Sequence, residues 1–180
     1  MQFCFATISM AALVLSVSSA DAQSSSDPPC RYSVQKQIAF TAPAAKDRLK
    51  VSIGPGACHS ARLYIVVRSA QGRILYRYVA PFKQHVATQW DDPELPQIAR
   101  QFVDETVLRS LVPKGEFPTP KLDGQAEDGG QRLAVPASVF KRLASSGQPM
   151  IYHQTYYEGG QYVVFDPVTR RVRVVVREGI

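Results

Sequence analysis

Histidine and cysteine are scarce in this sequence, and neither occurs at a spacing that binds metal ions. The chain of 180 residues contains three of each. His59, His85 and His153 stand singly, and no CxxC or HxxxH pair occurs. Zinc sites need three or four ligands at ordered spacing. The sequence therefore predicts neither a metal site nor a cofactor.

The common catalytic motifs are also missing. The sequence has no GxSxG, no glycine-rich phosphate loop and no HExxH. Asp91, Asp92 and Glu94 cluster beside Trp90, and paired carboxylates serve glycosidases. Acidic residues also favour helix N-termini, however, and that role accounts for all three. Because catalytic triads assemble from distant positions, these absences disfavour an enzyme without deciding the question.

Only one long apolar stretch is present, at residues 3–17, and no Lys or Arg precedes it. It is shorter than the roughly 20 apolar residues that a membrane-spanning helix needs. Small residues follow it, as in a secretory signal. We therefore expect residues 1–22 to be a signal peptide cleaved between Ala22 and Gln23, and residues 23–30 to be a short disordered leader. No transmembrane segment is expected in the mature chain, which would be periplasmic or secreted.

Export determines how the cysteines are interpreted. Cys4 would leave with the signal, so the mature chain would keep Cys30 and Cys58. A pair of cysteines in an oxidising compartment predicts a disulfide. Two alternatives are a metal ligand and a reactive thiol served by His59. Adjacent side chains in a strand point to opposite faces, which disfavours the thiol alternative.

Residues 31–180 are expected to form a single α+β domain with a long loop at 113–131, a segment rich in Pro, Gly and charge. Alternating apolar residues predict strands, and apolar residues recurring at three and four positions predict helices. The expected strands are 33–40, 48–53, a hairpin at 61–80 turning near Gln71–Gly72, 150–157, 161–165 and 171–178, and the expected helices are 93–112, capped by Asp92, and 136–147.

These elements predict a mostly antiparallel sheet, with two hairpin or meander regions, packed against one long amphipathic helix and one short helix. The long helix, with Phe102 and Leu108 in its apolar stripe, would cover the sheet face that carries Leu63, Ile65 and Val67. In the alternative arrangement, each half of the chain forms a separate small sheet.

Positive charge gathers on strands, in a chain whose formal net charge is +6. In a register that pairs Ala70 with Arg73, the outward face of the 61–80 hairpin carries Tyr64, Arg68, Arg73 and Arg77. Arginine binds phosphate and carboxylate through two parallel hydrogen bonds, so these four residues form a candidate anionic-ligand surface. The alternatives are a solvated face, or a face covered by the 136–147 helix. A second outward set is Arg171, Arg173 and Arg177.

The sequence thus favours an exported, non-catalytic binding or accessory protein of the cell envelope, either an inhibitor or a binder of anionic ligands. Its expected partner is an anionic envelope component or an extracytoplasmic protein, and not nucleic acid. The alternative is a small periplasmic hydrolase in which His85 or His153 meets a nucleophile or a carboxylate in a concave pocket. The tyrosines of residues 152–162 would form a sugar-binding face or, more simply, pack across strands.

Overall fold

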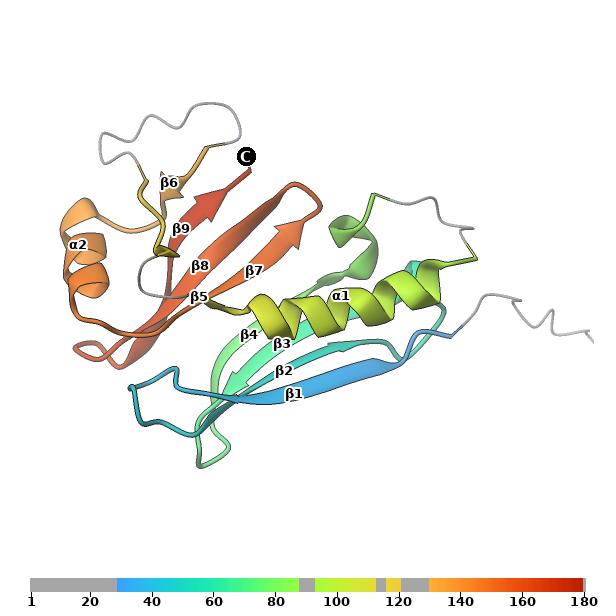
Figure 1. Ribbon diagram of the computed structural model, residues 1–180, viewed down its shortest axis with the longest axis horizontal. Coiled ribbons are helices and arrows are strands. Elements are labelled where there is room, and N and C mark those ends of the chain that lie inside the picture. Colours follow the sequence, from blue (N-terminus) through green and yellow to red (C-terminus); the bar gives the residue numbers. More distant parts are fainter. Residues whose placement is uncertain (1–28, 88–92, 113–115, 121–129, 180) are drawn as a thin grey trace, which may run out of the picture.

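A computed structural model describes residues 29–87, 93–112, 116–120 and 130–179 (Figure 1). The described chain has two antiparallel sheets, of four and five strands, and two α-helices. The expected α+β class is therefore confirmed. Each half of the chain forms its own sheet, which was the alternative arrangement. The expected signal peptide at 1–22 and most of the leader lie outside the described residues.

The first sheet is a meander whose inner face forms the main core. Leu49, Val51, Leu63, Ile65 and Val67 are all fully or almost fully buried there, and strict alternation sends their neighbours to the outer face. The strands, in sheet order, are β1 (Tyr32–Ile38), β2 (Asp47–Ile53), β3 (Arg62–Arg68) and β4 (Ile74–Pro81).

A β-bulge interrupts the hairpin of β3 and β4. Val67 pairs with Tyr76, but the next residue, Arg68, pairs with Ile74, so Leu75 is the extra residue. The turn closes with the Ser69 amide donating to the Arg73 carbonyl oxygen at 2.8 Å, so Ala70 does not pair with Arg73. One extra residue exchanges the two faces. Ile74 therefore lies outward and is 48% exposed, whereas a register that pairs Ala70 with Arg73 would turn it inward.

Helix α1 (Leu95–Arg109) packs on the inner side of β1 and β2. Its buried residues recur every fourth position: Leu95, Ala99, Val103 and Val107. The helix begins later than expected, with Glu94 as N-cap; the expected cap, Asp92, lies outside the described residues. Phe102 packs edge-on against Phe82 with ring centroids 5.6 Å apart. Leu108, in contrast, is 72% exposed, so its expected place in the core is wrong.

The second sheet is covered on both faces, so adjacent apolar residues of one strand are buried against different cores. Ile151 and Val163 join the main core, whereas Met150 and Val164 join a second core. Its strands, in sheet order, are β5 (Leu111–Val112), β7 (Met150–Tyr156), β8 (Gly159–Asp166), β9 (Arg171–Glu178) and β6 (Arg132–Leu133). The two-residue strands β5 and β6 were not expected.

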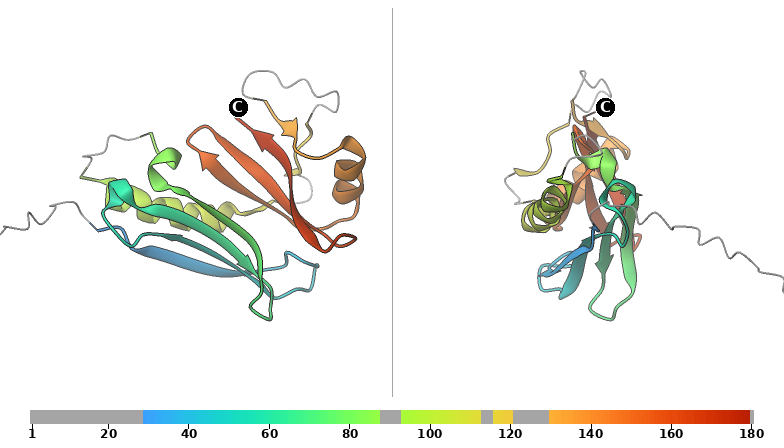
Figure 2. Two further views of the ribbon diagram at one scale, coloured as in Figure 1. Left: turned by 180° about the vertical axis from the view of Figure 1, so that it is seen from behind. Right: turned by 90° about the vertical axis from the view of Figure 1, so that its right-hand side faces the viewer.

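Helix α2 (Ala137–Ser145) closes the second core with Phe140 and Leu143. Seen from behind, the strands of the first sheet lie in front of α1, and α2 stands beside the second sheet (Figure 2). The short helix therefore does not cover the outer face of the 61–80 hairpin, as one alternative held. Most of the expected 113–131 loop lies outside the described residues.

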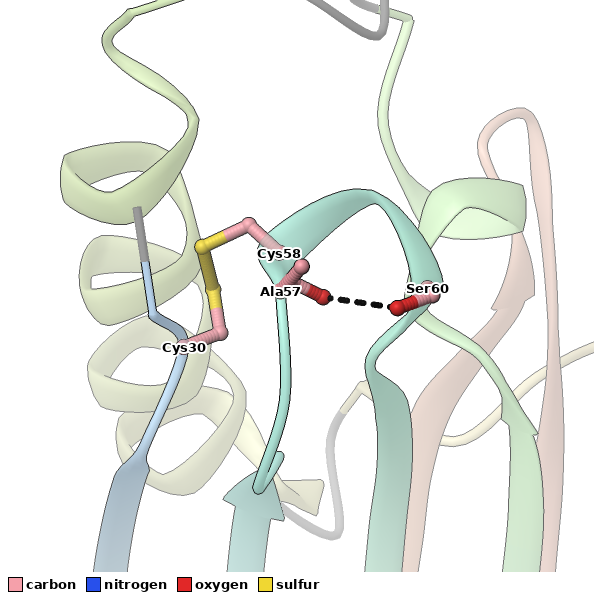
Figure 3. The surroundings of a disulfide bond; sticks show 4 residues. All are labelled: Cys30, Ala57, Cys58 and Ser60. Atoms are coloured by element: carbon pink, nitrogen blue, oxygen red, sulfur yellow. Dashed lines mark hydrogen bonds between the residues drawn. A yellow bond between two sulfur atoms is a disulfide. The ribbon is translucent and has the colours of Figure 1, made fainter. Parts of the chain in front are cut away.

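Cys30 and Cys58 form the expected disulfide, with their Cα atoms 4.7 Å apart (Figure 3). Cys58 begins the short 3-10 helix η1 (Cys58–Ser60), and both cysteines are buried. The amide of Cys30 also donates to the Gly56 carbonyl oxygen at 2.8 Å. The bridge thus fixes the start of the described chain against the turn between β2 and β3.

Candidate functional site

Five basic side chains lie exposed on the outer face of the first sheet. Alternation places them there, because their neighbours in β2 and β3 are the buried core residues of the inner face. We call this surface the outer basic face and define it by Arg48, Lys50, Arg62, Tyr64, Val66, Arg68, Arg77 and Val79.

Strand register brings these residues into rows across the sheet. Arg48 lies directly opposite Arg68. In the next row Lys50 and Arg77 flank Val66, and in the third Tyr64 pairs with Val79. The outward residues of β1, which are Ser33, Gln35 and Gln37, are neutral. Within the four described strands, no acidic side chain faces outward.

These basic groups are not engaged in ion pairs with the described residues. Arg68 donates from Nη1 to the Gly72 carbonyl oxygen at 2.9 Å, an interaction that orients the guanidinium and leaves its charge uncompensated. The aromatic ring of Tyr64 and the side chain of Val66 are half-buried between the charges. The face therefore offers fixed positive charge around an apolar centre.

Arg73 does not belong to this face. The bulge turns it to the inner side, where it lines a cavity together with Ser69, Asp47 and Leu75. The structure therefore keeps Tyr64, Arg68 and Arg77 of the candidate surface together and separates Arg73 from them.

The second set of expected outward arginines, Arg171, Arg173 and Arg177, does not form one surface either. A second bulge, between Tyr162 and Val163, offsets the two ends of β9. Arg173 contacts the fully buried carboxylate of Asp166 at 3.1 Å. Arg142 of α2 holds the same carboxylate through two hydrogen bonds of 3.0 and 2.9 Å. These bonds, led by those from Arg142, hold the pKa of Asp166 well below its usual range. Arg173 therefore has a structural role, joining β9 to α2.

A buried polar cluster joins the two sheets through His153. The ring Nδ1–H of His153 donates to the Gln154 carbonyl oxygen at 2.7 Å, which leaves Nε2 to accept from the Tyr76 hydroxyl at 2.6 Å. The amide of Gln161 donates to the same hydroxyl at 2.6 Å. Burial lowers the pKa of His153 to about 4, so the ring is neutral and structural at pH 7.

His85, at the end of the 3-10 helix η2 (Phe82–His85), lies beside this cluster. Its Nδ1–H donates to the Pro81 carbonyl oxygen at 3.2 Å, and its Nε2 lies 3.2 Å from the Tyr78 hydroxyl. That hydroxyl donates to the Thr155 carbonyl oxygen at 2.8 Å. Burial lowers the pKa of His85. Tyr78 thereby links the first sheet to β7.

A small pocket of about 130 Å³ opens between α1 and β7. Phe102, Glu105 and Arg109 line one side, and Tyr152, His153 and Gln154 line the other. In the described chain, the ring nitrogens of His153 and His85 contact only tyrosine hydroxyls, the Gln161 amide and backbone carbonyls. Within the described residues, neither histidine ring contacts a carboxylate.

The tyrosines of β7 and β8 pack across strands. The rings of Tyr152 and Tyr162 lie 4.9 Å apart, and the Tyr162 hydroxyl donates to Glu178 at 3.3 Å. Gly160 is required beside them, because a Cβ there would overlap the Tyr152 ring. The expected strands 150–157 and 161–165 left the turn at residues 158–160, whereas β8 begins at Gly159 and the turn falls at Tyr157–Glu158.

Arg48 and Lys50 were not recognised as part of the candidate surface. The signal was present in the alternation of residues 48–53, which places both on the side opposite the core. Their proximity to Arg68 and Val66 depends on β2 pairing with β3, which no local pattern specifies.

Among the described residues, no cluster of potential metal ligands occurs, and no helix is long and apolar enough to cross a membrane. The disulfide is compatible with an oxidising, extracytoplasmic compartment. Comparison with protein-family models, with curated proteins and with solved structures finds no match for this chain.

Proposed function

We propose that this chain is an exported, non-catalytic binding protein that docks on an anionic lipid surface of the cell envelope through the outer basic face. One observation carries the proposal: five exposed basic side chains, with no acidic side chain facing outward on the described strands, surround Tyr64 and Val66 on an open sheet face.

A structural role explains this face poorly. Like charges directly opposite each other destabilise a sheet, and Arg48 opposes Arg68. Basic residues do protect sheet edges from pairing with other chains. However, β2 and β3 are central strands that have no free edge. A ligand of opposite charge gives these side chains a role that the fold itself does not supply.

The chemistry of the face suits lipid phosphates. Arginine binds phosphate oxygens through paired hydrogen bonds, and each Lys or Arg near an anionic membrane contributes about 1 kcal/mol. Tyrosine rings favour the boundary between head groups and acyl chains. Ile74, which is 48% exposed next to Arg68, adds an apolar contact at the rim. Together these features favour a broad anionic surface over a small ligand.

The hydrolase alternative has less support. It required a histidine in contact with a nucleophile or a carboxylate, and the described contacts of His85 and His153 are of other kinds. An inhibitor role would need a partner protein in place of lipid, and the experiment below separates the two.

Sedimentation with vesicles tests the proposal. Purified protein should bind phosphatidylglycerol-containing vesicles and not pure phosphatidylcholine vesicles, and binding should weaken as salt rises, because screening shortens to about 8 Å at physiological ionic strength. The triple variant Arg48→Gln, Arg68→Gln and Arg77→Gln should lose most of this binding.

The matched control removes the same charge elsewhere, through Arg100→Gln, Arg171→Gln and Arg177→Gln, all of which are exposed. It should bind nearly as well as the unaltered protein. Equal loss in both triple variants would mean that only net charge matters. Absence of binding to anionic vesicles at low salt, or binding only to an envelope protein or wall polymer, would refute the lipid proposal.

Mass spectrometry of the recovered protein tests export separately. Protein recovered from the extracytoplasmic fraction should begin at Gln23 and be lighter by the two hydrogens lost in forming the disulfide. An intact N-terminus in protein confined to the cytoplasm would contradict the export part of the proposal.

A further inference from the structure

A second cavity, of about 800 Å³, is lined by residues of three turns. The ribbon shows these turns close together at one end of the molecule (Figure 1, lower left). The turns are the loop between β1 and β2, the hairpin turn between β3 and β4, and the turn between β8 and β9. We call it the three-turn cavity. The residues used below are Lys46, Asp47, Ser69, Arg73, Leu75, Phe165 and Arg170.

The charge of this cavity is strongly positive. Lys46, Arg73 and Arg170 come from three different turns and make no ion pair within the described chain. The one acidic group, Asp47, is buried, and its carboxylate accepts from the amide and the hydroxyl of Thr41 at 2.7 and 2.8 Å. Three cations and one anion leave two uncompensated positive charges, which match a dianion.

A buried hydroxyl adds a specific signal. Ser69 is 7% exposed and lines the cavity, and its Oγ has no hydrogen-bond partner in the described structure. Buried polar atoms are almost always paired. The Oγ is itself closed to solvent, so a ligand oxygen supplies the missing partner when the turn of residues 69–73 adjusts around it.

The backbone of Arg170 gives a further indication. Its φ is +55°, and it is the one non-glycine residue with positive φ in the described chain. Arginine seldom adopts this conformation, whereas glycine does so easily. Such conformations cluster at functional sites, and they also occur at the end of hairpin turns such as the one between β8 and β9.

The remaining wall is apolar. Leu75 and Phe165 line the cavity beside the charged groups, and both also pack on the main core, which fixes their positions. Binding sites commonly combine a few polar groups with such apolar walls. The wall suits an organic body attached to the anionic group.

We propose that the three-turn cavity binds a phosphate monoester. Arg73, Arg170 and Lys46 hold the dianionic phosphate, the Ser69 hydroxyl donates to one phosphate oxygen, and the organic part rests against Leu75 and Phe165. This site is separate from the outer basic face, because the bulge places Arg73 on the opposite side of the hairpin from Arg68 and Arg77.

Phenyl phosphate is a suitable probe, titrated at low salt by calorimetry and by amide chemical shifts. We expect saturable binding, with shifts concentrated at residues 69–75 and 165–170 and not at 48–50 or 62–66. Inorganic phosphate should bind more weakly because it lacks the apolar body, and phenol should not bind. Equal binding of phenol, shifts centred on the outer face, or no binding at millimolar probe would refute the site.

Variants sharpen the test. Arg73→Gln and Arg170→Gln should each weaken phenyl phosphate binding by about tenfold, as the loss of a charged hydrogen bond implies, and Ser69→Ala should weaken it severalfold. Arg77→Gln is the matched control and should bind normally. Loss in Arg77→Gln as large as in Arg73→Gln would overturn the assignment. Arg73→Gln should retain vesicle binding, so the two proposals fail independently.

Discussion

At the scale of single residues, His153 holds distant parts of the chain together. It is 2% exposed and accepts a hydrogen bond from Tyr76, which lies in the other sheet. The neutral ring lets Nε2 accept from the Tyr76 hydroxyl, and a proton on Nε2 would force that hydroxyl to turn and accept instead. Burial enforces the same state by lowering the pKa.

The pH dependence of stability follows. The pKa of His153 is about 4 in the folded protein and about 6.5 in an unfolded chain. Between these values the unfolded chain binds a proton that the folded protein does not, so stability is present at neutral pH and falls as pH falls. Acidification from pH 7 to pH 5 should lower the free energy of unfolding by about 2 kcal/mol through this group alone.

Urea unfolding at several pH values measures the effect. The pKa of His85 is also lowered, so His85 makes the free energy of unfolding depend on pH with the same sign. Comparison with the variant His153→Asn isolates the contribution of His153. That variant should be less stable at pH 7 and lose less stability on acidification. An unchanged slope between pH 5 and pH 7 would show that His153 is not the responsible group.

At the scale of elements, long periodic patterns predicted helices and strands reliably, whereas the short edge strands of the second sheet were not predicted. The alternation in β2 and β3 and the four-residue spacing in α1 are local signals, so those elements were found from sequence. Strands β5 and β6 each have two residues, too few for a period to be visible. Because Leu111 and Val112 pair with β7, the helix ends before them, although their apolar spacing extends the helical stripe.

Helix α1 offers a paired test of its packing. Val103→Ala should cost about 2 kcal/mol, because the removed methyl groups leave a cavity in the main core. Leu108→Ala, five residues further along the helix, should cost less than about 0.5 kcal/mol, because Leu108 is 72% exposed. Chemical denaturation of both variants checks the pair. A larger loss for Leu108→Ala would mean that the helix is rotated relative to the structure described here.

At the scale of the whole molecule, the sequence predicted the α+β class and the disulfide, but not how the parts meet. The three-turn cavity draws Lys46, Arg73 and Arg170 from segments far apart in the chain, and no local pattern relates them. The outer basic face was half predicted, since Arg68 and Arg77 follow from alternation, whereas the proximity of Arg48 depends on sheet order. Arg73 was misplaced because a bulge cannot be counted in advance.

The disulfide should contribute to the stability of the entire chain. It closes a loop with a sequence separation of 28, for which chain-entropy arguments give about 3–4 kcal/mol. The double variant Cys30→Ala, Cys58→Ala should unfold at a correspondingly lower denaturant concentration. Reductant should destabilise the unaltered protein but not this variant. Vesicle binding should persist below the unfolding transition. A loss of less than about 1 kcal/mol would mean that the unfolded chain is already compact in this region.

The bulge at Leu75 has a consequence for how much one hairpin can do. Arg73 and Arg77 are four positions apart, and in an unbroken strand an even spacing puts both side chains on the same side. The one extra residue instead sends Arg77 toward the exterior and Arg73 toward the interior of the turns. A single short stretch of chain can thus present arginines to two different surfaces, whereas a strand that kept all its residues without the bulge would carry Arg73 and Arg77 on one face.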